Sequence, residues 1–365
     1  MILSRIDNGA VGKILGHNIY DDSGRPLLKS GVRLNERYVR RLKEKGYLSV
    51  YVRDELAPDL VPEETIDTET RKRAVGSVRQ LSQRMHLGES VDVGRISSVV
   101  DEIVEDLKAC PEGIISLSSM KTVDDYTFEH SVNVCILSTY LWWYLYGDGC
   151  PLIEMGMGAL LHDVGKLAIP LEILLKPGSL TREEYSEVKR HARVGYNALR
   201  EILPENSRSP MVAGEHHERL DGSGYPLGID ADRISRFGRI AAVADIYDAV
   251  TSDRVYRDGM RSHEAMALLA DMAGTQLDAE IVEILGARVA HYPGGTRVSL
   301  GNGQLGIVVG QDQRSSRRPR IRLLTDASGA VLPAAKAEEI ALFDEPQLEI
   351  AEVLDEYPDE VLRQA

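Results

Sequence analysis

The chain has 365 residues, a length that suggests two or three domains. Hydrophobic residues make up 43% of the chain and charged residues 27%, which is ordinary for a globular protein. The net charge of −14 argues against a polymeric nucleic acid as partner, because such partners need a basic surface, but it leaves room for a small anionic ligand held by metal ions and a few arginines.

Cysteine usage and hydropathy bear on the compartment. The three cysteines are widely spaced and odd in number, which favours free thiols in a reducing compartment. The N-terminal sequence MILSRIDNG does not resemble a secretory signal. The most apolar stretch, residues 134–146, is shorter than the roughly 20 residues that cross a bilayer. We therefore expect a cytoplasmic protein without a membrane span, in which this stretch is a core helix.

Residues 1–56 are predicted to form a small α/β module. Two apolar runs flank residues 22–24 (DSG), which is a hairpin signal. Asn35 is placed to cap a helix over ERYVRRLKEK, and Gly46 is placed to end it before the strand-like YLSVYV. The module's role is not indicated by these residues.

Residues 57–109 are predicted to be a linker and connecting helices. The chain is rich in proline and acidic residues up to residue 70. Apolar residues then recur with helical spacing at Ile96, Val99, Val100, Ile103 and Leu107. Residues 110–292 also have a dominant helical pattern and contain most of the histidines.

The residue pattern changes from helical to strand-like after residue 292. Residues 293–345 are predicted to form a small β domain with hairpin turns at residues 301–303 (GNG) and 328–329 (SG). The basic run at residues 315–320 (SSRRPR) is more typical of a solvated loop than of a binding patch. Residues 346–365 are predicted to be an acidic helical tail.

Seven side chains with metal-binding chemistry stand beside apolar helical runs. They are His130, His162, Asp163, His191, His216, His217 and Asp245. A single histidine on an apolar helix is usually a core residue, but burying five imidazoles without a ligand would leave donors and acceptors unpaired. Neutral imidazoles and carboxylates suit first-row divalent ions, so we predict a metal cluster.

Spacing within the cluster suggests further roles. The two oxygens of Asp163 could bridge two ions. Lys166 shares a helical face with His162 if the helix continues, and it would offer a cation to phosphate. Asp248 follows Asp245 by three residues and is a candidate to hold a metal ligand in place.

Two arginines follow in the same region. Arg254 and Arg257 lie one helical turn apart in DRVYR. On their own they fit an exposed, ion-paired helix end as well as a ligand-binding role.

Six sequence blocks carry a resemblance to a known family. HSVNV, LLHDVGKLAIP, ILLKPGSLT, VKRHARVG, HHERLDGSGYP and ADIYDAVTSDRVYR follow one another in the order and spacing of the HD-GYP family, a branch of the HD metal-dependent phosphohydrolases. The resemblance covers about half of the chain, roughly residues 120–290. It implies an all-helical HD-type core at 110–292, which together with the small N-terminal α/β module and the small C-terminal β appendage predicted above gives a mainly α protein.

The resemblance also implies residue roles. By position, the seven residues above are metal ligands, with Asp163 bridging and, together with Lys166, catalytic. The substrate contacts would come from Lys166, Arg254, Arg257 and Tyr225, the last of which belongs to a Gly-Tyr-Pro loop that forms a wall of the pocket.

The number of ions depends on one position. Some family members hold a third ion with a glutamate four residues before the first histidine, where this chain has Tyr126. A neutral phenol is a poor ligand for a divalent ion, and Glu129 points about 100° away around the helix. We therefore expect two ions, iron or manganese.

The implied activity is hydrolysis of cyclic di-GMP to linear pGpG, or further to GMP, in bacterial second-messenger signalling. Two ions would activate the nucleophile and the phosphoryl group, while Lys166 and the arginines neutralise developing charge. Three alternatives are left open: a phosphodiesterase for another cyclic dinucleotide, a different HD phosphohydrolase acting on nucleotides, and a metal-bearing receptor without turnover. A homodimer and a regulatory protein partner are also left open.

Overall fold

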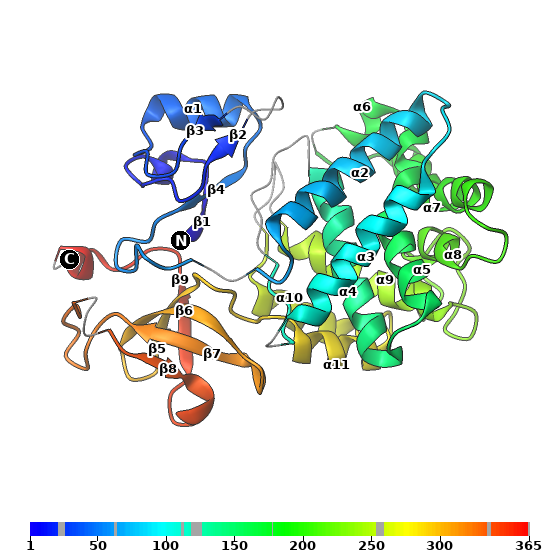
Figure 1. Ribbon diagram of the computed structural model, residues 1–365. Helices are drawn as coiled ribbons and strands as arrows, with labels where there is room; N and C mark the ends of the chain where they lie inside the picture. Colours follow the sequence, from blue (N-terminus) through cyan, green and yellow to red (C-terminus); the bar gives the residue numbers. More distant parts are fainter. Residues whose placement is uncertain are drawn as a thin grey trace.

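The structure, a computed structural model, describes residues 1–20, 26–61, 64–110, 113–117, 126–176, 178–252, 259–333 and 337–363. A helical domain occupies one side of the molecule, and the two ends of the chain form the other side (Figure 1). The predicted fold class, a mainly α protein with a small N-terminal α/β module and a small C-terminal β appendage, is confirmed.

The N-terminal module follows its sequence signals closely. Asn35 caps α1, where its side chain accepts a hydrogen bond from the amide of Tyr38 at 2.9 Å. Gly46 follows the helix with φ of 77°, a backbone conformation that ends helices and suits glycine. The predicted turn at 22–24 lies outside the described residues, although the strands on either side of it pair. The elements are β1 (Ile2–Arg5), β2 (Ile19–Tyr20), β3 (Pro26–Leu28), α1 (Glu36–Glu44) and β4 (Ser49–Val52), together with the 3-10 helix Asn8–Ala10.

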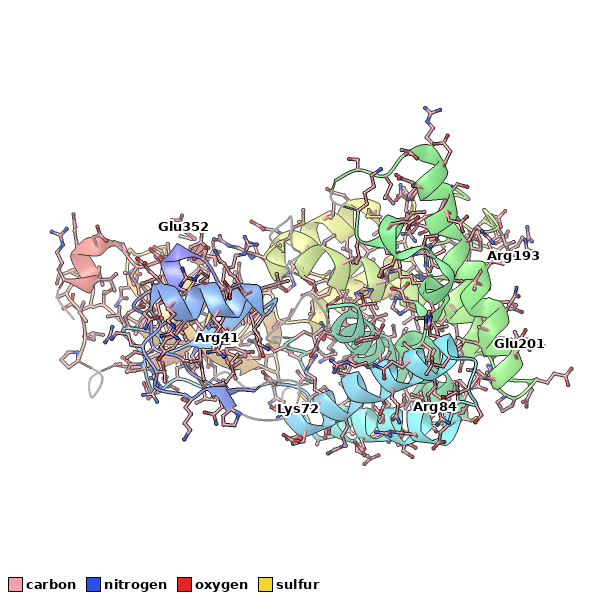
Figure 2. All side chains as sticks on the ribbon, turned by 90° about the horizontal axis from the view of Figure 1, so that it is seen from above. Arg41, Lys72, Arg84, Arg193, Glu201 and Glu352 are labelled. Carbon is pink, nitrogen blue, oxygen red and sulfur yellow. The ribbon has the colours of Figure 1, made fainter. Side chains whose placement is uncertain are left out.

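Two connecting helices follow, α2 (Thr68–His86) and α3 (Val93–Ala109), which pack against each other. Asp67 caps α2 and Asp92 caps α3. The apolar face that the spacing predicted is confirmed, because all five of its residues are buried in α3. Charged side chains such as Lys72 on α2 stand on the outside of the molecule (Figure 2).

The helical domain is built around α4, which contacts α2, α3, α5, α9 and α11. Residues 134–137 in its middle are completely buried, as expected for a core helix. Within the part of the chain that is described, no helix is long and apolar enough to cross a membrane. The elements are α4 (Tyr126–Tyr146), α5 (Cys150–Leu160), the 3-10 helix η2 (Val164–Ala168), α6 (Leu171–Leu174), α7 (Arg182–Ile202), α8 (Ser209–Glu215), α9 (Arg236–Thr251), α10 (Ser262–Met272) and α11 (Ala279–Arg288).

The C-terminal part is an antiparallel sheet with strand order β8-β7-β6-β5-β9. The hairpin predicted to turn at 301–303 is confirmed, since β5 and β6 flank it. The turn predicted at 328–329 is present, but only the isolated bridge Thr325–Val331 flanks it. The strands are β5 (Arg297–Leu300), β6 (Leu305–Asp312), β7 (Ser315–Leu323), β8 (Glu339–Ala341) and β9 (Ile350–Leu354).

Two predictions for this part are wrong. The tail at 346–365 is not simply helical, because residues 350–354 form β9 and only the short α12 (Asp359–Leu362) is a helix. The edge of β5 offers unpaired backbone groups, and pairing with them outweighs the weak helical preference of a short segment. The basic run at 315–320 is not a loop but the first part of β7, where Pro319 lies beside an irregularity in the pairing with β6, a place that tolerates its missing amide hydrogen.

The two ends of the chain share one hydrophobic core. Leu42 and Val52 of the N-terminal module belong to the same buried cluster as Ile307 of the sheet. The buried guanidinium of Arg297 in β5 donates a hydrogen bond to the carboxylate of Asp54 at 2.8 Å, between the two parts. The ends therefore pack as one body beside the helical domain (Figure 1).

Candidate metal centre

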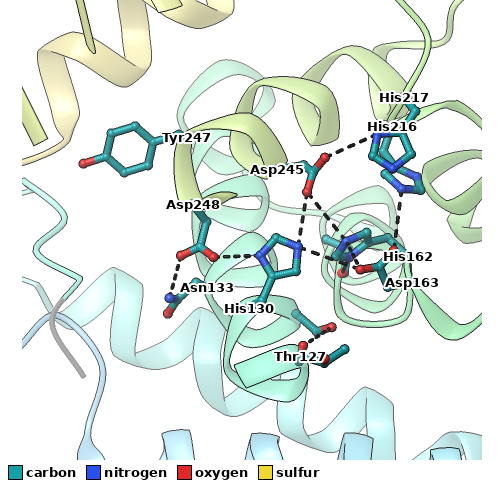
Figure 3. A network of polar contacts seen from close by, with 12 residues as sticks. Thr127, His130, Asn133, His162, Asp163, His216, His217, Asp245, Tyr247 and Asp248 are labelled. Atoms are coloured by element: carbon teal, nitrogen blue, oxygen red, sulfur yellow. Dashed lines mark hydrogen bonds and ion pairs between the residues drawn. The ribbon is translucent and has the colours of Figure 1, made fainter. Parts of the chain in front are cut away.

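The structure brings the seven predicted metal-binding residues together in the helical domain. Figure 3 labels six of them, all except His191. They come from five separate segments, and all except His217 are buried. His217 keeps 20% of its side chain exposed, so the centre opens to solvent on its side. The residues are His130 on α4, His162 and Asp163 after α5, His191 on α7, His216 and His217 after α8, and Asp245 on α9.

The first group of ligand atoms belongs to His130, His162 and Asp245, which we call the His130 half. One ligand atom from each residue lies within 4.8 Å of the others, close enough to share an ion. His130 Nε2 lies 3.2 Å from Asp245 Oδ1, and His162 Nε2 lies 3.4 Å from Oδ2 of Asp163. The His130 half thus includes one oxygen of the Asp163 carboxylate.

The second group belongs to His191, His216 and His217, which we call the His191 half. Their ligand atoms also lie within 4.8 Å of one another, with His191 Nε2 at 3.4 Å from His216 Nε2. The other oxygen of Asp163, Oδ1, lies 3.4 Å from His191 Nε2 and 3.9 Å from His216 Nε2. Asp163 therefore presents one oxygen to each half.

Two buried atoms at the centre lack a hydrogen-bond partner among the described residues. They are Nε2 of His162 and Oδ1 of Asp163. A buried polar atom left without a partner costs about 1–3 kcal/mol, so folding would not leave two of them together without compensation. Both atoms have lone pairs that a divalent cation can accept, and the mixture of imidazoles and carboxylates suits first-row divalent ions. The residues present therefore fit a metal centre.

Protonation differs between the two halves. Burial holds the pKa of His216 well below its usual value and lowers that of His217 to about 3, so both imidazoles are neutral and keep a lone pair. Burial also lowers the pKa of His130, but hydrogen bonds to Asp245 and Asp248 outweigh it and raise that pKa to about 9. A cation that binds the His130 half must therefore displace a proton.

The shared carboxylate is ionised. Burial raises the pKa of Asp163, but the charge of Lys166 and interactions with His162 hold it well below the usual value. An ionised carboxylate accepts through both oxygens, as a position between two groups of imidazoles requires.

The orientation of three imidazoles is set locally. An Nδ1–H that donates to a carbonyl oxygen leaves the lone pair on Nε2, where the other ligands converge. In each case the carbonyl lies three or four residues earlier in the chain. The pairs are His162 with Ala159 (2.7 Å), His191 with Val188 (2.7 Å) and His216 with Val212 (3.0 Å).

His130 is oriented in another way. Its Nδ1 lies 2.7 Å from Oδ2 of Asp248, one turn after Asp245 on α9. The prediction that Asp248 holds one of the ligand residues in place is consistent with this contact.

The segment after His162 does not continue the α-helix. The helix α5 ends at Leu160, and Val164–Ala168 form a 3-10 helix instead. Gly165 explains the change, because a Cβ there would collide with the backbone of His191, so this turn can lie directly against α7. Lys166 still reaches the centre, and its ammonium donates to Oδ2 of Asp163 at 2.5 Å.

The Gly-Tyr-Pro loop covers the open side of the His191 half. The ring of Tyr225 packs on the imidazole of His217, with 4.6 Å between ring centroids. A Cβ on Gly224 would approach the backbone of residues 217–219 to 2.5 Å, so only glycine allows the loop to lie this close. Burial raises the pKa of the Tyr225 phenol, which keeps its hydroxyl protonated at neutral pH.

Comparisons with known proteins agree with this architecture. Residues 148–281 match a family model described as HD domain, and residues 297–360 match one described as KOW domain associated with HD domain. The cyclic di-GMP phosphodiesterase PA4108 of Pseudomonas aeruginosa is 38% identical over 259 residues, which are 71% of this chain and 62% of that protein. The HD-domain match and the named relatives bear out the resemblance to the HD-GYP family. The chain spans less than two thirds of the length of PA4108.

Two further proteins resemble this chain over different lengths. The 3'3'-cGAMP-specific phosphodiesterase 3 of Vibrio cholerae is 38% identical over 155 residues, which are 42% of this chain and 34% of that protein. Among solved structures, Bd1817, a HDG"Y"P protein from Bdellovibrio bacteriovorus, covers 78% of this chain and 97% of its own, at 16% identity and a TM-score of 0.46.

Sequence reasoning missed one residue that shapes the HD-GYP loop. The buried carboxylate of Glu218 accepts hydrogen bonds from the amides of Leu227 (2.7 Å) and Ile229 (3.1 Å) and so closes the loop on itself. An acidic residue just before a glycine-rich stretch, where backbone amides lack partners, was the available signal.

The side chains at three predicted positions lie outside the described part of the structure. Arg254 and Arg257 belong to the segment 253–258, and the side chain of Tyr126 is likewise not described. Their predicted roles stay predictions.

Proposed function

We propose that this HD-GYP protein is a metal-dependent phosphodiesterase that hydrolyses cyclic di-GMP to linear pGpG in bacterial second-messenger signalling, with GMP as the product of a second cut. The observation that carries the proposal is the position of Asp163, whose two carboxylate oxygens face two separate groups of imidazoles. A carboxylate so placed is suited to a dinuclear phosphodiesterase centre. The name of PA4108 supports the choice of substrate.

The centre is proposed to hold two divalent ions, iron or manganese. One ion would be bound by His130, His162 and Asp245, the other by His191, His216 and His217, with Asp163 shared between them. Such ions supply Lewis acidity toward a phosphoryl oxygen and lower the pKa of an attacking water. The absence of a carboxylate at position 126 supports two ions rather than three.

Lys166 and Tyr225 are proposed to act on the substrate itself. The side chain of Lys166 is 33% exposed and its ammonium lies at the shared carboxylate, where it can bind a phosphate oxygen and neutralise charge that develops in the transition state. The protonated hydroxyl of Tyr225 can donate to the same phosphate. Arg254 and Arg257 are proposed to bind the substrate from the neighbouring segment.

The test is reconstitution under oxygen-poor conditions. Protein stripped of metal is loaded with Fe²⁺ or Mn²⁺, its metal content is measured, and cyclic di-GMP is followed by chromatography. We expect two ions per chain and metal-dependent formation of the linear dinucleotide. Tight binding of cyclic di-GMP without turnover by fully loaded protein would contradict the enzyme and indicate a receptor, and three ions per chain in active protein would contradict the proposed stoichiometry.

An adenine-containing cyclic dinucleotide is a second candidate substrate. The observation in its favour is the 38% identity to a Vibrio cholerae relative named as specific for 3'3'-cGAMP. The ratio of kcat/KM for the two dinucleotides, measured on the same metal-loaded sample, distinguishes them. A higher kcat/KM for 3'3'-cGAMP than for cyclic di-GMP would identify 3'3'-cGAMP as the preferred substrate.

A further inference from the structure

A continuous chain of buried hydrogen bonds leads from the connecting helix α2 to the metal centre. Arg71 of α2 donates from Nη1 to Oδ1 of Asn133 at 2.8 Å. Asn133 donates from Nδ2 to Oδ1 of Asp248 at 2.7 Å, and Oδ2 of Asp248 lies 2.7 Å from Nδ1 of His130 (Figure 3). All four residues are at least nine-tenths buried, so water does not compete for these bonds.

The two ends of this chain fix the direction of its bonds. A guanidinium has donors only and a carboxylate accepts, so the Asn133 amide turns its oxygen toward Arg71 and its NH₂ group toward Asp248. Oδ1 of Asp248 accepts from Asn133, and Oδ2 accepts from Nδ1–H of His130. The other ring nitrogen of His130, Nε2, points at the other ligands of the His130 half and is the atom that can give its lone pair to a cation once its proton is displaced.

We propose that Arg71 is a positioning residue for the metal centre, which holds the Asn133 amide and, through it, the Asp248 carboxylate against Nδ1 of His130, and so makes metal affinity depend on the placement of α2. This inference rests on the proposed role of His130 as a metal ligand, but not on the identity of the substrate.

The position of Arg71 would allow movements elsewhere in the protein to change the metal affinity through this chain of bonds. Residue 71 lies in the first turn of α2, which begins at Thr68 directly after the linker from the N-terminal module. That module and the C-terminal sheet form one body, which is joined to the helical domain by the chain just before α2 and also contacts it where β7 meets α11. A displacement of this body would therefore act on the start of α2. A shift that separates Arg71 from Asn133 would release the amide to rotate, and Asp248 would lose the donor that holds its carboxylate against His130.

A competing explanation is that Arg71 only attaches α2 to α4. Its guanidinium also lies 3.2 Å from the carboxylate of Glu129, a partly buried ion pair that could serve this purpose alone. The two explanations predict different results when the ion pair and the bond to Asn133 are removed separately.

The experiment compares variants of the full chain by competition with a chelator, which gives the affinity of each Mn²⁺ ion. Arg71→Met and Asn133→Ala remove the chain of bonds. Glu129→Gln removes the ion pair with Arg71 and leaves the bond between Arg71 and Asn133 in place. Arg73→Met removes an exposed arginine on the same helix that pairs with Glu102 at 2.8 Å. We expect the first two variants to bind one ion about 10–100-fold more weakly and the other ion normally, as for other residues that orient a metal ligand. Glu129→Gln and Arg73→Met should bind both ions as the natural protein does.

Two outcomes would overturn the proposal. One is unchanged affinity for both ions in Asn133→Ala, which keeps the Arg71–Glu129 pair and so stays informative if Arg71→Met does not fold. The other is an equal loss in Glu129→Gln, which would assign Arg71 a packing role. Hydrolysis of cyclic di-GMP is measured on the same variants. The expected pattern of metal affinities would support this inference even if the protein did not hydrolyse cyclic di-GMP.

Discussion

The two halves of the metal centre obtain the same ligand geometry by different means. In the His191 half, His191 and His216 are oriented by backbone carbonyls of their own helices, three and four residues away. In the His130 half, His162 is oriented by a backbone carbonyl in the same way, but His130 is oriented by the carboxylate of Asp248, 118 residues away in the sequence. A backbone carbonyl cannot be removed by substitution, whereas a carboxylate can be replaced or displaced. Substitution of a side chain therefore cannot remove the groups that orient His191 and His216, whereas substitution of Asp248 can change the metal affinity of the His130 half.

The halves also differ in charge before a cation binds. The pKa of His217 is lowered to about 3 by burial, while that of His130 is raised to about 9 by its two aspartates against the effect of burial. The same burial thus gives a neutral imidazole at His217, whose Nδ1 lies 3.6 Å from the carboxylate of Asp245, and a protonated one at His130, where Asp248 faces Nδ1 at 2.7 Å and Asp245 faces Nε2 at 3.2 Å. Partners, rather than burial alone, decide which half holds a proton.

The largest expected effect removes what the halves share. Asp163→Asn replaces one of the two oxygens by an amide nitrogen and removes the negative charge, so both ions should be lost and hydrolysis should fall below detection. Metal analysis and chromatography of cyclic di-GMP measure the two effects. Normal metal content with full activity in this variant would refute the bridging role.

Removing one ligand from each half should separate them. His130→Ala and His191→Ala should each reduce metal content from about two ions to about one and lower kcat by at least about 100-fold, because a two-metal mechanism needs both ions. The measurement is metal content after removal of free ions, with activity on the same samples. If either variant lost both ions, the halves would not be separable sites.

Lys166 tests the distinction between metal binding and substrate binding. Lys166→Ala should keep both ions and lower kcat by about 10²–10³-fold, the usual loss for one electrostatic contact to the transition state. Lys176→Ala is the matched control. That lysine pairs with Glu184, with 2.6 Å between the ammonium and the carboxylate, and neither residue belongs to the metal centre. A metal-free Lys166→Ala protein would move this lysine from substrate binding to the support of Asp163.

Asp248→Asn should change the half in which a side chain, rather than a backbone carbonyl, orients a histidine, namely the His130 half. Asn133 donates to the residue at 248, so the new amide would turn its oxygen to Asn133 and its NH₂ group to His130. His130 would then carry its proton on Nε2, and the affinity of the His130 half should fall by about 10–100-fold while the other half is unchanged. Chelator competition measures both affinities, and an equal loss in both halves would contradict the tautomer argument.

The smallest effect concerns the loop over the His191 half. Tyr225→Phe keeps the ring that packs on His217 but removes one donor to phosphate, so both ions should stay bound and KM should rise by no more than about tenfold, the worth of one hydrogen bond. Steady-state kinetics at saturating metal measure it. A loss of metal from this variant would mean that the hydroxyl supports the centre.

Local features of the fold were predictable because neighbours in the sequence decide them. The Asn35 cap, the stop at Gly46 and the buried face of α3 depend on residues within one or two helical turns. The strand at 350–354 was not predictable in the same way, because it forms only where β5 provides an open edge. The end of α5 before His162 likewise depends on the close approach of Gly165 to α7.

The sequence by itself determined which residue types could form the metal centre and, through the helix geometry, how His162, His191 and His216 are turned. A carbonyl three or four residues earlier lies beside such a side chain in any helix, whatever the rest of the chain does. Only the tertiary structure decided that Asp163 lies between the two halves, that Asp248 meets His130, and that Arg71 lies behind them. These contacts join segments that are far apart in the chain, and they exist because α2 and α9 bury their apolar faces against α4.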